Sequence, residues 1–123
     1  MLMKSGQEVP AFIAGDGTWL KELLHPQRDG VNLPYSLAEA VLSGREASLP
    51  HVLESNETYF VLNGSGTLFL NGTPYPLESG DLVLVPAGTE QYLVNTTERP
   101  LRFLCIVDPP WTAEGEKVFH SVK

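Results

Sequence analysis

Short apolar stretches separated by turn residues follow one another along residues 37 to 107. These stretches are rich in β-branched and aromatic residues, which is the pattern of an all-β sandwich or barrel. Helical candidates in this region are few. We expect a meander of about five strands between residues 57 and 107, in the segments ETYFVLNG, GTLFLNGTPYPL, DLVLVPAG, EQYLVNT and LRFLCIVDPP.

Turn residues support this division of the chain. Asn71-Gly72 stands between two apolar runs, and this dipeptide is the strongest short hairpin signal. Pro109 and Pro110 follow the last run and cannot donate to a ladder of hydrogen bonds, so we expect strand pairing to end there.

The two ends of the chain are less regular. In the N-terminal third, TWLKELLHP and SLAEAVLSG contain good helix formers, although a sheet that needs strands at its edges could override so short a propensity signal. The stretch PPWTAEGEKVFHSVK is polar, and we expect an irregular surface tail. With no linker or internal repeat, we expect one domain over residues 1–123, with a barrel core at about 35–108, an N-terminal arm at 1–34 and a tail at 109–123.

Composition narrows the class of protein. Apolar and aromatic residues make up 42% of the chain and charged residues 19%, which is typical of a globular domain. Because no apolar run reaches the roughly 18 residues of a membrane span, and no secretory segment is evident, we expect a soluble, cytoplasmic protein without a membrane partner. The formal net charge of −7, with scattered Lys and Arg, argues against nucleic-acid binding. The lone Cys105 lies in an apolar run and is interpreted as a buried core residue.

Two spaced groups of residues indicate a known family. A glycine, a histidine, a glutamate and a second glycine form the first group, and a glycine, a proline, a glycine and an asparagine form the second. This pattern resembles the two motifs of the cupin family of small β-barrels, although one residue too many separates the first glycine from the histidine. The residues that carry the resemblance are Gly44, His51, Glu57 and Gly64, followed by Gly80, Pro86, Gly88 and Asn95.

The resemblance implies an all-β cupin fold, a double-stranded β-helix or jelly-roll barrel, and in most members a divalent metal at its centre. Two of the four usual ligand positions are changed, because Leu53 replaces the second histidine of the first motif and Gln91 replaces the later histidine. A metal, if bound, would rest on His51, Glu57 and Gln91, with His25 as a further candidate from the N-terminal arm.

Strand alternation places the remaining polar groups together. His51, Leu53 and Glu57 share parity, so a regular strand would turn them all toward the barrel interior, with Gln91 opposite. His51 and Glu57 could then act as a general acid–base pair, or could hydrogen-bond with Gln91 as a satisfied polar cluster.

Tyr59 and Tyr92 could line the pocket beside Leu53 and Gln91 or pack in the core.

Three classes of function remain open at the level of the sequence. The first is an acid–base isomerase, epimerase or lyase that binds a small polar or anionic molecule beside a degenerate metal site. The second is a metal-dependent oxygenase or isomerase, and the third is a ligand-binding or sensing module without turnover. We also expect a homodimer, because exposed sheet edges and an apolar outer face favour pairing.

Overall fold

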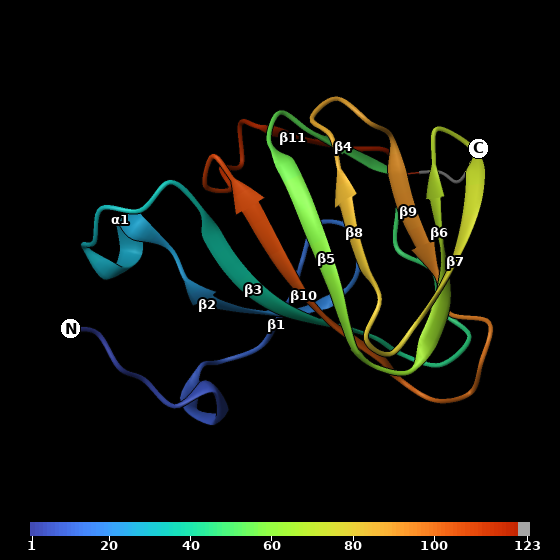
Figure 1. Ribbon diagram of the computed structural model, residues 1–123, viewed down its shortest axis with the longest axis horizontal. Coiled ribbons are helices and arrows are strands. Elements are labelled where there is room, and N and C mark those ends of the chain that lie inside the picture. The colour runs from blue at the N-terminus through green and yellow to red at the C-terminus, as the bar shows by residue number, and fades with distance from the viewer. Residues whose placement is uncertain (121–123) are drawn as a thin grey trace.

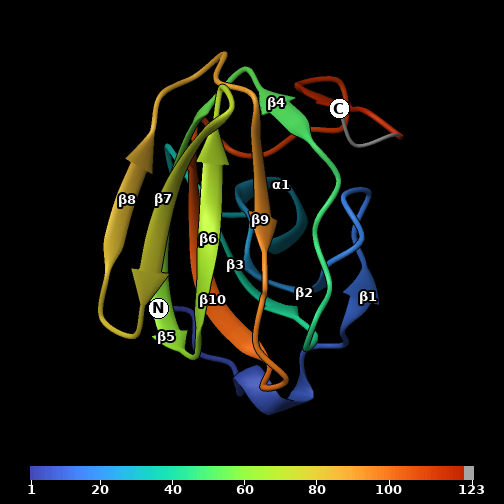
Figure 2. The ribbon, with the colours of Figure 1, turned by 90° about the vertical axis from the view of Figure 1, so that its right-hand side faces the viewer.

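The computed structural model of the protein describes residues 1–120, which form two antiparallel sheets packed face to face (Figures 1 and 2). One sheet has the order β1 (Phe12–Ile13), β2 (Trp19–Leu24), β3 (Ser36–Leu42), β10 (Leu101–Asp108), β5 (Asn56–Asn63) and β8 (Leu82–Val85). The other has the order β11 (Glu116–Val118), β4 (His51–Leu53), β9 (Gln91–Val94), β6 (Ser65–Leu70) and β7 (Thr73–Glu78). Two short helices, η1 (Gly6–Glu8) and α1 (Pro26–Asp29), precede β3.

The connectivity is that of a jelly roll, as the resemblance implies, and differs from the expected meander. β5 pairs with β10 and β8, while β6 pairs with β9 and β7, so most neighbours in a sheet are distant in sequence. The β6–β7 hairpin confirms the turn signal, since Asn71 and Gly72 both have positive φ, at 48° and 84°.

Alternating burial turns one face of each strand to the interior. In β10, Leu101, Phe103, Cys105 and Val107 are buried and the residues between them are more exposed. In β5 the inward residues are Glu57, Tyr59 and Val61. The buried Cys105 joins the hydrophobic core, which confirms its interpretation as a packed apolar residue.

Both helix-favouring segments of the N-terminal third form strands. β3 pairs with β10 along its whole length and β2 covers the other side of β3. Ser36, Ala40 and Leu42 of β3 are buried at strand spacing, so tertiary pairing outweighs local helix propensity. Between β2 and β3, Pro26–Asp29 forms the single helical turn α1.

The C-terminal segment also differs from the expected irregular tail. Residues Glu116–Val118 form β11, which pairs antiparallel with β4, opposite Leu53, Val52 and His51. The final residues 121–123 of that tail lie outside the described part of the chain.

Several motif residues have a structural reason to be present. Gly80 and Gly88 have φ of +90° and +82°, which a side chain rarely adopts. A Cβ on Gly44 would clash with the carbonyl oxygen of Glu98. The second motif ends at Asn95, which is buried and hydrogen-bonded to the loop that follows β9. These residues shape the barrel whether or not it holds a metal.

Among residues 1–120, no helix is long and apolar enough to cross a membrane.

Candidate functional site

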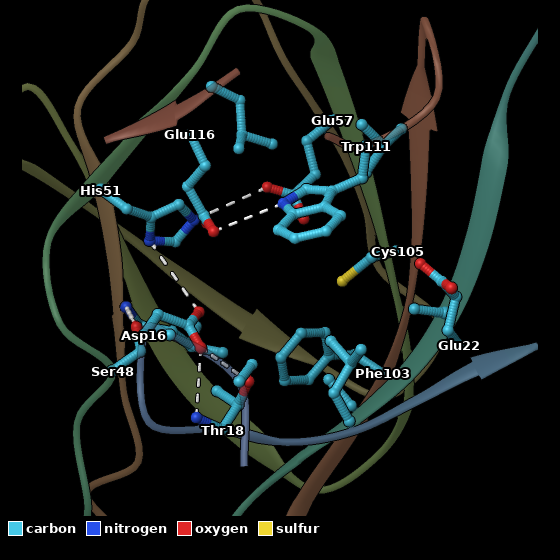
Figure 3. Close-up of a pocket in the computed structure, with 18 of the residues that line it drawn as sticks. Asp16, Thr18, Glu22, Ser48, His51, Glu57, Phe103, Cys105, Trp111 and Glu116 are labelled. Carbon is cyan, nitrogen blue, oxygen red and sulfur yellow. Dashed lines mark hydrogen bonds and ion pairs between the residues drawn. The ribbon is translucent and has the colours of Figure 1, made fainter. Parts of the chain in front are cut away.

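A cavity of about 150 Å³ lies between the two sheets (Figure 3). Its walls come from β1, β2, β3, β4, β5, β9 and β10, and the loop before β2, the segment before β4 and the segment around β11 contribute the rest. Phe12, Ile13 and Trp111 line the cavity and are also substantially exposed, which places them at its rim. The walls are mostly apolar, and Asp16, Glu57 and Glu116 lie around His51, whereas Glu22 lies on the opposite side (Figure 3).

The imidazole of His51 is buried between two carboxyl groups. Its Nε2 lies 3.8 Å from Oε1 of Glu57, on β5. On the other side of the ring, Nδ1 donates to the carbonyl oxygen of Leu49 at 3.1 Å and lies 3.9 Å from Oδ2 of Asp16. The ring is therefore fixed through Nδ1, and Nε2 faces Glu57.

The charged neighbours decide the protonation state of His51. Burial alone would lower its pKa, but the Glu57 carboxyl, with smaller contributions from Asp16 and the Leu49 carbonyl, raises the pKa to about 9. His51 is consequently an imidazolium at neutral pH and can donate a proton from Nε2.

The Glu57 carboxyl has an unsatisfied oxygen. Its Oε1 is buried and, within residues 1–120, is the single buried side-chain polar atom without a hydrogen-bond partner. Tyr59 and Cys105 line the same cavity, and burial, reinforced by the charge of Glu57, raises the pKa of both groups well above their usual values. Both groups stay protonated at neutral pH, so neither a phenolate nor a thiolate is available in the cavity.

Two further acidic residues reach the site from outside the expected barrel core. Asp16 belongs to the loop before β2, where its Oδ1 accepts from the backbone N–H and hydroxyl of Thr18. Glu116 begins β11, and its Oε1 accepts from the indole Nε1 of Trp111 at 3.3 Å. Burial raises the pKa of Glu116, and the nearby charge of His51 partly opposes this.

Sequence reasoning missed Asp16 and Glu116 because neither belongs to a recognised motif. Asp16 stands between two glycines in AGDGTW, which signals a turn and nothing about a cavity.

The sequence-predicted residues separate into two groups. The cavity is lined by His51, Leu53, Glu57 and Tyr59. The single regular strand expected over 51–57 is interrupted, because His51 and Leu53 lie on β4 of one sheet and Glu57 lies on β5 of the other. Gln91 is buried beside them, but its Oε1 accepts from the Tyr59 hydroxyl and it is not among the lining residues. The satisfied cluster of His51, Glu57 and Gln91 therefore does not form.

Tyr92 does not belong to the site. It follows the inward Gln91 on β9, so alternation turns it to the opposite face, where its ring stacks on Phe69 with centroids 4.7 Å apart. The expectation that it lines the pocket or packs in the core thus disagrees with the structure.

His25 is likewise held elsewhere. As the N-cap of α1, it accepts from the Gln27 N–H at Nδ1, and its Nε2 bonds to the Trp111 carbonyl at 2.8 Å. Both ring nitrogens are engaged, so the structure does not bring His25 to His51 as a metal ligand.

The donor set does not fit the divalent metal that the fold family implies. Leu53 occupies one ligand position, and Gln91 is bonded to Tyr59. Asp16 and Glu57 lie at opposite nitrogens of one imidazole, so they cannot join His51 around a single ion. No group of three or more His, Cys, Asp or Glu in the described chain is arranged to hold a metal ion.

Comparisons with known proteins agree with the fold. An uncharacterised protein of Methanocaldococcus jannaschii is 32% identical over 115 residues, covering 92% of this chain and 90% of that protein. An L-ectoine synthase of Mycobacterium sp. (strain KMS) is 32% identical over 98 residues, covering 78% of this chain and 73% of that protein. The solved structure of Pac13, a nucleoside dehydratase from Streptomyces, superposes with a TM-score of 0.76 at 20% identity, covering 100% of this chain and 94% of that one.

The family model of the cupin domain matches residues 39–107, from β3 to β10. This match includes both motifs and more than half of the chain, and the barrel has the jelly-roll topology that the motifs imply. The chain therefore belongs to the cupin family.

Proposed function

We propose that the protein is an acid–base catalyst of the isomerase, epimerase or lyase type, which acts on a small molecule in the cavity without a metal. One observation carries the proposal. The buried Oε1 of Glu57 has no hydrogen-bond partner and faces the Nε2 of a protonated His51 at 3.8 Å. A carboxylate and an imidazolium at this separation supply a base and an acid to the same bound ligand.

Each group has a defined role in this proposal. Glu57 removes a proton from a carbon of the ligand, and His51 delivers a proton from Nε2 to the oxygen or nitrogen on which charge develops. Leu49 and Asp16 act on Nδ1, where they orient the ring and stabilise its charge. The apolar walls exclude water, which strengthens these interactions.

The relatives support a reaction of this type. A dehydratase removes water from its substrate, and such an elimination needs one proton to be taken and another to be supplied. The nucleoside dehydratase shares this fold. The L-ectoine synthase, which is 32% identical in sequence, is named as an enzyme. This support concerns the type of reaction and not the substrate.

Deuterium incorporation tests the proposal even though the substrate is unidentified. The protein is incubated in D₂O with mixtures of small metabolites, and proton NMR follows the loss of C–H signals and the appearance of elimination products. The parent chain is expected to exchange or convert at least one compound. Glu57→Gln should reduce that rate by about 10²- to 10⁴-fold, because the base is lost while the side-chain volume is kept.

Glu54→Gln is the matched control, since Glu54 is exposed and outside the cavity. It should exchange the compound at the parent rate. Equal rates for Glu57→Gln and the parent would contradict the proposal, and a ligand that binds without any exchange would instead support a binding module.

A further inference from the structure

The cavity walls carry an excess of carboxyl groups (Figure 3). Asp16, Glu22, Glu57 and Glu116 line the cavity, whereas His51 is the one lining side chain that carries a positive charge among the described residues. Glu22 has its own counter-ion, because its Oε1 lies 2.8 Å from Nη1 of Arg28. Three carboxyl groups therefore share one imidazolium.

The unsatisfied oxygen of Glu57 indicates what the ligand must supply. The Glu57 side chain is only 9% exposed, and its Oε1 accepts no hydrogen bond. A buried carboxylate oxygen without a donor is costly, and a ligand N–H would remove that cost. A ligand carboxylate has no proton to donate and would add like charge to the same wall.

The remaining walls suit a cation on an apolar body. Phe103, Trp111 and Tyr59 present aromatic rings to the cavity, and ring faces attract organic cations. Leucine and alanine side chains form much of the other surface. A volume of about 150 Å³ accepts a body about the size of a benzene ring.

We infer that the cavity binds a small primary ammonium compound with a compact apolar body, and that it discriminates against carboxylates of the same size. This narrows the polar or anionic ligand expected from the sequence to a cationic one. The inference rests on the proposed function only in that both use the Glu57 carboxyl.

Three probes of one shape test the inference by binding alone. Cyclopentylammonium, cyclopentanol and cyclopentanecarboxylate are titrated into the full chain at neutral pH, and affinity is measured by calorimetry or by ligand-detected NMR. The ammonium probe is expected to bind at least about tenfold more tightly than the alcohol, and the carboxylate more weakly than either.

Variants identify the carboxyl group responsible. Glu57→Gln should lower the affinity for the ammonium probe by about tenfold and change the affinity for cyclopentanol little. Glu54→Gln should change neither affinity. Circular dichroism confirms that each variant is folded. Equal affinity for the three probes, tighter binding of the carboxylate, or no ammonium binding at concentrations on the order of 10 mM would overturn the inference.

Failure of this inference is distinguishable from failure of the proposed function. Ammonium binding without any deuterium exchange would leave the inference standing and remove the catalytic proposal. Deuterium exchange of an anionic or neutral compound, without preferential binding of the ammonium probe, would support the catalytic proposal and overturn the inference.

Discussion

At the scale of single residues, the site depends on how His51 is held. Its two ring nitrogens have different surroundings, because Nδ1 is bonded to a backbone carbonyl near Asp16 while Nε2 faces the unsatisfied oxygen of Glu57. Leu53 lies on the same face of β4 and fills the position of a metal ligand with an apolar side chain. The proposed proton transfer therefore rests on His51 and Glu57, in a barrel interior where Leu53 takes the place of a metal ligand.

The raised pKa of His51 predicts a specific dependence of stability on pH. Its pKa is about 6.5 in the unfolded chain and about 9 in the folded chain, so the folded state holds the proton more tightly. The resulting stabilisation is fully present below pH 6.5 and is lost as pH rises through 9. Deprotonation of His51 should therefore lower the free energy of unfolding by about 3 kcal/mol between these two pH values.

Urea denaturation at about pH 6 and about pH 9.5, on either side of that interval, measures this difference. A His51→Gln variant, which cannot carry the charge, should show a much smaller decrease than the parent. An equal decrease in both proteins would assign the pH dependence to other groups and contradict the charged state of His51.

At the scale of elements, loop and strand ends join the sheets around the cavity. Asn95 follows β9, where its Nδ2 donates to the carbonyls of Leu42, Ser43 and Arg99 and its Oδ1 accepts from the N–H and hydroxyl of Thr97. The asparagine of the second motif thus ties the end of β3 to the loop before β10.

Removal of this asparagine should destabilise the fold without touching the site chemistry. Asn95→Ala leaves several buried backbone groups without partners, so we expect a loss of about 2–4 kcal/mol in the free energy of unfolding, measured in urea. Asn63→Ala, at an exposed asparagine at the end of β5, should change it by less than about 0.5 kcal/mol. If Asn95→Ala lowered the free energy of unfolding as little as Asn63→Ala, the structural role of Asn95 would be contradicted.

At the scale of the whole molecule, residues far apart in sequence complete one cavity. The loop before β2 brings Asp16, and the C-terminal β11 brings Glu116, to a barrel in which β4 carries His51 and β5 carries Glu57. The N-terminal arm and the expected tail are therefore parts of the sheets and of the site. The proposed catalysis and ligand charge preference both depend on this assembly.

Sequence patterns predicted the parts of the site that depend on local alternation. Alternation from His51 predicted that Leu53 and Glu57 face the interior, and both line the cavity, although the chain passes from one sheet to the other between them. The same rule excludes Tyr92, because it is adjacent to the inward Gln91. Asp16 and Glu116 could not be found this way, since their positions depend on tertiary packing of the loop before β2 and on the pairing of β11 with β4. Local helix propensity was outweighed by strand pairing, which joins β2 to β3 and β3 to β10.

The outer face of the six-stranded sheet predicts a homodimer. Leu82 and Leu84 are 63% and 59% exposed on the edge strand β8, and the register places Leu82 beside Phe60 of β5. Leu104 and Ile106 of β10 extend this apolar strip. An exposed apolar strip of this kind is typical of an interface, and we expect a second copy of the chain to cover it.

Light scattering after size-exclusion chromatography tests the dimer. The parent should have twice the mass of the chain, and Leu84→Glu should convert it to a monomer by placing a charge in the interface. Tyr75→Glu, at an exposed aromatic residue of the other sheet, should leave the dimer intact. A monomeric parent, or a dimer that tolerates Leu84→Glu, would contradict this arrangement.

The most direct test of metal-free acid–base catalysis is the deuterium-exchange rate of protein dialysed against EDTA, measured beside untreated protein on the same compound. We predict equal rates for both preparations and a loss of about 10²- to 10⁴-fold in Glu57→Gln. Loss of deuterium exchange after dialysis, with recovery when a divalent metal is added, would contradict metal-free catalysis.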